Sequence, residues 1–145
     1  HGGALPGFQF SFQRYPDARV TGVALSNSEW GAAEKLATDL AGLCLGEQPY
    51  PAEVSISAEV LDRYVRAYRL DDTTVLVTRE DGRLTTRFGA QPPSVLYAAD
   101  DNAFFQKVAD ATMTFTYDAH GEVTEMVVFQ NGQTYRFARI SPAAR

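Results

Sequence analysis

Few residues in this chain have the types and spacing that support chemistry. Its two histidines, His1 and His120, are too far apart to form a metal-binding pair on one helix. The single cysteine, Cys44, can form neither an intrachain disulfide nor a thiolate zinc site. His120 lies in the run 118–121 between two predicted strands, which is typical of an exposed turn. We therefore expect no metal ion and no cofactor.

The carboxylates do not form an obvious catalytic pair either. Acidic pairs occur at 71–72, 80–81 and 100–101, all at predicted hairpin ends, and no calcium-binding spacing accompanies them. The many aromatic residues of the second half follow strand periodicity, which favours packing in a core. A cavity that some of them line for a small apolar ligand is the alternative, because small barrels can hold one small molecule.

The remaining candidate is His1-Gly2-Gly3, which precedes an apolar strand pattern. Glycines at the start of a strand allow another backbone or a ligand to approach closely. Phe8, Phe10 and Phe12 then alternate with polar residues, which predicts a half-buried strand. A turn at Pro16 leads to a return strand at 20–25.

A helix is predicted after this hairpin. Ser26 and Glu29 have the spacing of a capping box, although Asn27 or Ser28 are alternative caps. Apolar residues then recur at helical spacing from Trp30 to Cys44, and the helix is expected to end before Gly46. We assign this segment to 1–46, a proline-containing linker to 47–57 and a third segment to 58–145.

The third segment is predicted to be antiparallel sheet after a short helical turn. Asp81-Gly82 and Asn131-Gly132 are typical of two-residue hairpin loops. Short strands at regular spacing without intervening helices indicate a sandwich or a small barrel. The predicted strands cover 64–70, 74–79, 83–88, 94–98, 103–108, 111–117, 122–129 and 133–140. The fold class is therefore mainly β, with about eight strands in the barrel.

The bulk composition limits the possible partners. A net charge of -5 and a pI near 4.9 argue against nucleic acid, because its binders need a basic face. No run approaches the ~20 apolar residues that cross a bilayer, and the chain carries no export signal of its own.

The first segment resembles the final stretch of the serine β-lactamase-like fold. The resemblance rests on the run 1–8, on the strand that ends in Ser26-Asn27, and on the helix that follows. This superfamily includes class C β-lactamases, penicillin-binding-protein-like peptidases and esterases, and its third active-site motif is Lys-Thr-Gly or His-x-Gly. The resemblance implies that His1 and Gly3 lie on the strand that edges the catalytic cleft, where the histidine helps to position substrate.

Residues 57–140 are similar to a domain of unknown function that is often appended to these hydrolases. The resemblance implies a lipocalin- or streptavidin-like barrel. Arg66 stands where the family usually has glycine, so a local bend or edge can differ there. The matching features are Tyr64, Tyr68, the Val75-x-Val77-x-x-Glu80-Asp81-Gly82-x-Leu84 pattern, Phe115, Gly121 and Asn131-Gly132 near Arg139.

The residues that perform the superfamily's acyl transfer are missing. That chemistry needs a serine activated by lysine in Ser-x-x-Lys. The lysines here are Lys35 and Lys107, and the residues three positions earlier are Ala32 and Phe104. We therefore predict that the parent protein is a serine hydrolase and that this chain is inactive alone. An independent enzyme is disfavoured, because no nucleophile–base pair is recognisable.

The resulting prediction is a noncatalytic C-terminal accessory domain of a bacterial β-lactamase-like serine hydrolase. Its main partner is the parent catalytic domain in the same polypeptide. Because the hairpin and helix would expose an apolar face, we also expect a homodimer or a segment swap through residues 8–45. The location is periplasmic or secreted if the parent carries a signal peptide.

Overall fold

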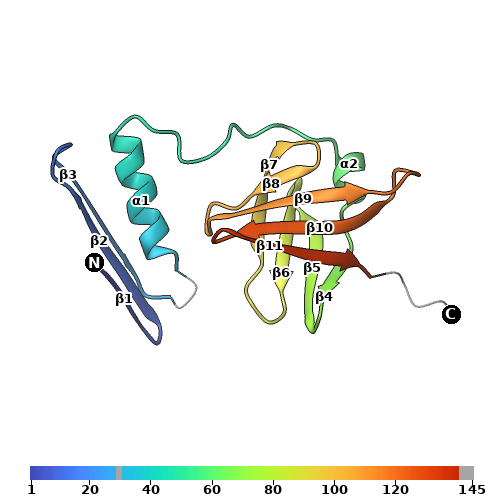
Figure 1. The fold of residues 1–145 in the computed structure, drawn as a ribbon, viewed down its shortest axis with the longest axis horizontal. Helices are drawn as coiled ribbons and strands as arrows, with labels where there is room; N and C mark the ends of the chain where they lie inside the picture. Colours follow the sequence, from blue (N-terminus) through green and yellow to red (C-terminus); the bar gives the residue numbers. More distant parts are fainter. Residues whose placement is uncertain (29–30, 141–145) are drawn as a thin grey trace. The chain divides into compact units, whose positions relative to one another are not determined.

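The computed structural model describes residues 1–28 and 31–140 and divides into two compact units (Figure 1). The first unit is His1–Pro51 and the second is Ala52–Arg145. The division therefore falls between Pro51 and Ala52, within the proline-containing segment 47–57.

The first unit is a three-stranded antiparallel sheet with one helix. The strands are ordered β1-β2-β3, so β2 lies in the centre. Strands β2 and β3 agree with the predicted hairpin, whereas β1 was expected only from the resemblance and not from the residue pattern of its own segment. The elements are β1 (Gly2–Leu5), β2 (Phe8–Tyr15), β3 (Val20–Ser26) and α1 (Ala33–Cys44).

Small residues let α1 pack closely on one face of this sheet. Ala24, Ala33 and Ala37 form a small buried cluster between the sheet and the helix. A Cβ atom added to Gly22 would lie 2.8 Å from the backbone oxygen of Ala37, so a larger residue at this position would displace the helix. The apolar Phe8, Phe10 and Phe12 alternate away from α1 onto the opposite face.

The predicted N-terminal cap of the helix is wrong. The N-cap residue of α1 is Ala32, which makes no side-chain capping hydrogen bond, and the helix begins at Ala33. The Ser26 hydroxyl instead accepts a hydrogen bond of 3.2 Å from the backbone N–H of Ser28, so it belongs to a local turn. Glu29 and Trp30, which also entered the prediction, lie outside the described residues. The predicted end is confirmed, since Gly46 follows with a φ of 81°.

The second unit is a closed antiparallel barrel of eight strands, which confirms the predicted fold class. A short helix, α2 (Ala58–Asp62), precedes it, and the Ser57 hydroxyl caps this helix by accepting from the N–H of Val60. The last strand pairs with the first and closes the barrel. The strands are β4 (Ala67–Leu70), β5 (Thr73–Glu80), β6 (Arg83–Phe88), β7 (Ser94–Asp100), β8 (Ala103–Phe105), β9 (Ala111–Tyr117), β10 (Val123–Gln130) and β11 (Gln133–Arg139).

Two predicted strands are shorter than expected. β4 begins at Ala67 rather than at residue 64, because the N–H of Tyr64 still bonds to the Leu61 carbonyl in a turn after α2. β8 ends at Phe105, since the chain turns at once and Gln106 N–H bonds to the Ala111 carbonyl.

The turn residues behave as their types predict. Asp81 and Gly82 have φ angles of 49° and 76°, and Asn131 and Gly132 have 51° and 75°. Positive φ at both central positions is what a two-residue hairpin loop of type I′ requires. Arg66 is not among the residues with positive φ, so the arginine sits there without backbone strain.

Aromatic side chains fill the interior of the barrel. Tyr64, Tyr68, Phe104 and Phe115 are all buried, and the ring of Tyr64 stacks on Phe115 with centroids 4.2 Å apart. The Tyr68 hydroxyl donates to the Tyr64 carbonyl at 3.0 Å. The Tyr64 hydroxyl donates to the Asp101 carbonyl at 2.8 Å and also bonds to the Tyr117 hydroxyl.

Burial changes the acidity of both tyrosines. Desolvation is the largest cause that raises the pKa of Tyr64 above the usual tyrosine range, and the hydrogen bond to Tyr117 adds to it. Desolvation likewise raises the pKa of Tyr68. The folded barrel therefore favours the neutral form of both phenols over the phenolate.

Candidate functional site

The two residues predicted to form a cleft motif lie on or beside β1, an edge strand of the first unit. The backbone nitrogen of His1 donates to the Phe12 carbonyl at 2.7 Å, and the Phe12 N–H donates to the His1 carbonyl at the same distance. Gly3 is paired with Phe10. Because residues directly opposite each other share a face of a sheet, this register assigns His1 and Gly3 to the phenylalanine face.

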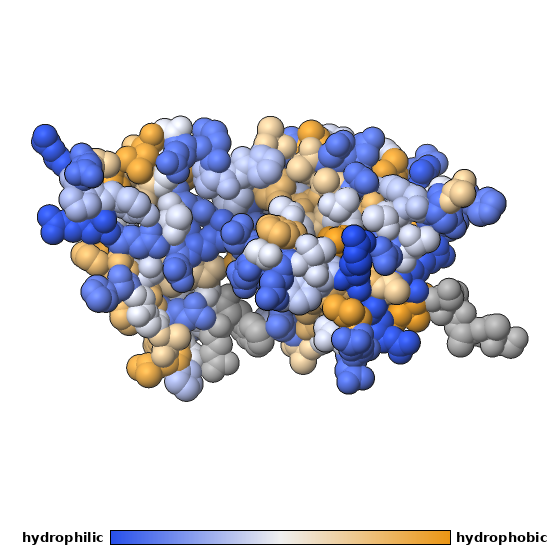
Figure 2. Space-filling view, viewed as in Figure 1, coloured by the Kyte–Doolittle hydropathy of each residue, from blue (hydrophilic) through white to orange (hydrophobic). Residues whose placement is uncertain are grey.

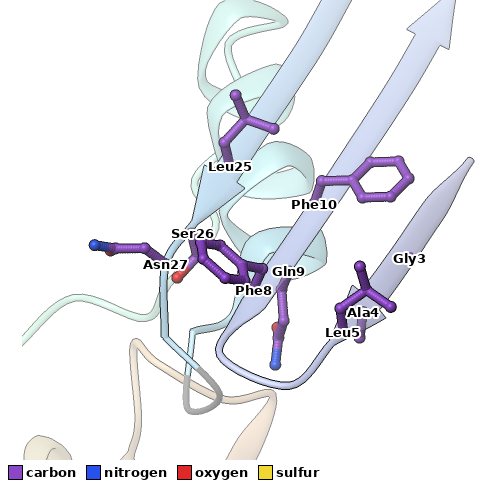
Figure 3. Close-up of a pocket in the computed structure, with 9 residues that line it drawn as sticks. All are labelled: Gly3, Ala4, Leu5, Phe8, Gln9, Phe10, Leu25, Ser26 and Asn27. Atoms are coloured by element: carbon purple, nitrogen blue, oxygen red, sulfur yellow. The ribbon is translucent and has the colours of Figure 1, made fainter.

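Gly3 lies in close contact with the ring of Phe10, and a side chain at position 3 would displace that ring. A Cβ atom at Gly3 would lie 2.5 Å from Cε1 of Phe10, which is closer than atoms can approach. Figure 3 shows the Phe10 ring extending from β2 toward β1, where Gly3 lies. The glycine therefore shapes the surface beside β1 through close contact, as expected of a strand glycine.

An open apolar hollow lies on this face of the sheet. Its volume is about 510 Å³. Figure 2 shows hydrophobic atoms, in orange, at the lower left, where the β1–β2 hairpin lies. The hollow (Figure 3) is lined by Gly3, Ala4, Leu5, Phe8, Gln9, Phe10, Leu25, Ser26 and Asn27.

A second hollow, of about 550 Å³, lies beside β1 and includes His1. Its other walls come from the rest of β1, from Phe10 and polar residues of β2, and from the start of α1. The helix packs against β3 and β2, and Gln13 ties it to the sheet by donating to Thr38 Oγ1 at 2.9 Å and to the Glu34 carbonyl at 3.3 Å. The edge strand β1 is thus left accessible.

The described residues around these hollows do not include an activated nucleophile. Ser11 Oγ accepts a long hydrogen bond from the Gln13 amide, and Ser26 Oγ accepts from the Ser28 backbone. Lys35 forms an ion pair of 3.0 Å with Asp39 and lies over the ring of Tyr50. The site therefore offers an edge strand, a close-contact glycine and an apolar wall.

The other sequence candidates do not assemble into a site. His120 is exposed in a turn, where its N–H donates to Asp118 Oδ1 at 2.8 Å, as predicted. Among residues 1–28 and 31–140, no three His, Cys, Asp or Glu side chains gather in a way that could hold a metal ion. Within the same ranges, every helix is too short or too polar to cross a bilayer.

The register in which β1 pairs with β2 is the feature that sequence reasoning missed. The alternation of Phe8, Phe10 and Phe12 correctly indicated a strand with one apolar face. The prediction of a half-buried strand implied that this apolar face is buried, whereas all three side chains are exposed. The run 2–5 has no apolar alternation of its own, and the register that places Gly3 opposite Phe10 carries no local signal.

The fold and the site define a chain in which a short α/β element with an open sheet face precedes a small closed antiparallel barrel. Residues 51–139 match a family described as a domain of unknown function (DUF3471), so the chain belongs to this family. The match spans the linker end and the whole barrel.

One curated relative shares more of the chain. The chain is 32% identical over 126 residues to Penicillin-binding protein 4* from Bacillus subtilis (strain 168), covering 80% of this chain but only 28% of that protein. The chain also aligns with crystal structures of SurE with D-Leu and of SurE, at TM-scores of 0.45 and 0.47 and identities of 24% and 20%. Each alignment covers 97% of this chain and 34% of the solved one.

Proposed function

We propose that this chain is the C-terminal part of a β-lactamase-like serine hydrolase. In this proposal the first unit completes the sheet of the catalytic domain, and the barrel is a noncatalytic accessory domain. The observation that carries the proposal is the uncovered apolar sheet face on the unit that holds His1-Gly2-Gly3. The similarity to a penicillin-binding protein supports it.

The exposed face is too apolar to be a solvent-facing surface. Leu5 and Leu25 are 74% and 80% exposed, and the Phe8, Phe10 and Phe12 side chains beside them are also exposed. A contiguous patch of this kind marks a surface that another protein segment covers. The curated relative extends well beyond the aligned region. In this proposal, a preceding part of the parent polypeptide packs against the exposed sheet face and buries it.

The same arrangement suggests how the chain contributes to catalysis. The preceding part of the parent supplies the nucleophilic serine and its lysine, while β1 borders the cleft. His1 stabilises charge near the nucleophile, and Gly3 lets Phe10 pack where a side chain would otherwise project. Acyl transfer by the chain alone is expected to be undetectable.

A chimera with the curated relative tests this proposal. The aligned region of Penicillin-binding protein 4* is replaced by this chain, and covalent labelling by a fluorescent penicillin is measured. We expect labelling to be retained, and His1→Ala to slow it by about tenfold or more. The double substitution Phe10→Gln and Leu25→Gln should abolish labelling by disrupting the covered face.

The matched control is Leu76→Gln, which alters a partly exposed apolar residue on the barrel and should leave labelling unchanged. A folded chimera that takes up no penicillin would contradict the proposal. So would full labelling in the Phe10→Gln, Leu25→Gln chimera, because the face would then lie outside the catalytic domain.

The alternative function, binding of a small apolar molecule inside the barrel, has less support. Tyr64, Phe104, Phe115 and Met126 are fully or almost fully buried in the interior, where they take up the space that a ligand would need. A filled interior favours the accessory role.

A further inference from the structure

The segment that connects the two units is anchored on both sides of the point where they divide. The first unit ends at Pro51 and the second begins at Ala52. Both residues are exposed, and in the part of the chain that the structure describes neither takes part in a hydrogen bond or an ion pair. The residues before and after them are held by the unit to which they belong.

On the side of the first unit, the end of α1 fixes the path of the chain. Gly46, which has a φ of 81°, donates from its N–H to the Leu43 carbonyl at 3.1 Å. The N–H of Glu47 donates to the Gly42 carbonyl at 2.9 Å. Two bonds of this kind around a glycine with positive φ are a common way to end a helix, and they hold the backbone as far as Glu47.

The next anchor is a cluster that we call the Tyr50 clamp, made of Tyr50, Lys35 and Asp39. The Tyr50 hydroxyl donates to the Asp39 carboxylate, and Lys35 Nζ lies 4.6 Å from the centroid of the tyrosine ring. Lys35 and Asp39 form an ion pair of 3.0 Å, and their side chains are only 18% and 13% exposed. Charge-assisted hydrogen bonds and cation–π contacts are strongest where water is largely excluded, so the clamp holds Tyr50 against α1.

On the side of the barrel, the anchors begin immediately after Ala52. Glu53 pairs with Arg83 of β6 through N···O contacts of 2.9 and 3.0 Å. The backbone N–H of Val54 donates to the Ala98 carbonyl of β7 at 3.0 Å. The chain is therefore attached to the barrel from Glu53 onward.

Between these anchors, only a few backbone torsions are free to change. The ring of Pro51 locks its own φ, and a proline also restricts the residue before it to extended conformations. Peptide bonds are planar, so the soft torsions that remain are ψ of Pro51 and both dihedral angles of Ala52. Hinges between protein domains are typically a few loop residues that absorb changes in φ and ψ in this way.

We propose that Pro51–Ala52 is a hinge between the two units and that the Tyr50 clamp sets its length. With the clamp closed, the free chain runs from Tyr50 to Glu53 and spans at most about 10 Å. With the clamp open, it runs from Glu47 to Glu53 and spans at most roughly 20 Å. The clamp thus limits the range over which the barrel moves. The inference is independent of the proposed function, because it concerns only the segment that connects the units.

Backbone ¹⁵N relaxation of the full chain tests the position of the hinge. We expect an order parameter below about 0.6 at Ala52, and values near 0.85 at Glu47, Tyr50 and Val54. An order parameter at Ala52 as high as those of Tyr50 and Val54 would overturn the proposal, because the connection would then be rigid. Low values throughout 47–54 would also overturn it, because the anchors would then not hold.

Tyr50→Ala tests the clamp, because it removes both the hydroxyl that bonds to Asp39 and the ring that lies against Lys35. The fold should be kept, since Tyr50 belongs to neither hydrophobic core. We expect the order parameter at position 50 to fall to that of Ala52, while β5, β9 and β10 are unchanged. Gln48→Ala, which alters an exposed residue of the same segment, is the matched control and should leave position 50 rigid. Equal order parameters at position 50 in the two variants would contradict the role of the clamp.

Discussion

At the scale of single residues, the barrel depends on tyrosines whose hydroxyls are buried and bonded. The hydroxyl of Tyr68 bonds to the carbonyl of Tyr64, and the hydroxyl of Tyr64 bonds to Tyr117 and to Asp101. Burying a phenol costs little only if its hydroxyl has a hydrogen-bond partner, and removing it from solvent disfavours the charged phenolate. Both conditions hold here, and they make stability sensitive to alkaline pH.

We predict that the barrel loses stability as the pH rises above about 10. The unfolded tyrosine ionises near its ordinary pKa of about 10, whereas burial raises the pKa of Tyr64 and Tyr68 in the folded state. The stabilisation is therefore complete below that pH and is lost above it, by up to about 1.4 kcal/mol per pH unit for each tyrosine. Urea unfolding at a series of pH values measures the loss.

Tyr68→Phe separates this effect from general alkaline unfolding. The variant should be about 1 kcal/mol less stable near neutral pH, because it loses a hydrogen bond, but its stability should decline less steeply above pH 10. Tyr135→Phe changes an exposed tyrosine and is the control, which should follow the wild-type curve. An unchanged slope in Tyr68→Phe would disprove the assignment.

The residues that explain the site were only partly readable from the sequence. His1-Gly2-Gly3 could be recognised as a motif, because glycines before an apolar strand are unusual. That Gly3 makes room for the Phe10 ring could not be predicted, since it depends on the register between two strands.

At the scale of elements, turn chemistry and alternation predicted most of the barrel. Asp81-Gly82 and Asn131-Gly132 located two hairpins correctly because type I′ loops restrict their residues strongly. The start of α1 was missed because Ser26 bonds locally to Ser28 instead of capping the helix. Capping residues compete between several backbone partners, and tertiary context decides among them.

The packing of α1 on the sheet gives a prediction at this scale. Gly22→Ala should loosen the first unit by about 1–3 kcal/mol, because the new methyl group would clash with the Ala37 carbonyl. Hydrogen exchange of the β2 and β3 amides measures the effect without involving the barrel. Thr21→Ala, an exposed neighbour on the same strand, is the control and should change exchange little. Equal hydrogen-exchange rates in the Gly22→Ala and Thr21→Ala variants would show that α1 does not pack against Gly22.

At the scale of the whole molecule, the first unit has an apolar face that its own helix does not cover, because α1 lies on the other side of the sheet. The alternation of the phenylalanines predicted such a face. Its exposure was expected from the resemblance to a larger catalytic sheet and not from the alternation itself, because a period of two shows that one face is apolar and not what covers it.

We therefore predict that the chain alone associates through residues 8–45, as a dimer or by a segment swap. Sedimentation velocity at high micromolar concentration should show a species heavier than the monomer. The double variant Phe10→Gln and Leu25→Gln should be monomeric, whereas Leu76→Gln with Phe129→Gln, on exposed positions of the barrel, should still associate. A wild-type chain that sediments only as a monomer would argue against the proposal that the apolar sheet face must be buried by another protein segment.

The central claim is that a preceding catalytic domain covers the sheet face. Hydrogen exchange of the β1–β3 amides, measured in the chain alone and in the chimera with Penicillin-binding protein 4*, tests it most directly. The account predicts that these amides exchange markedly more slowly in the chimera, while those of β5, β9 and β10 in the barrel are unchanged. Equal exchange of β1–β3 in the two proteins would contradict it.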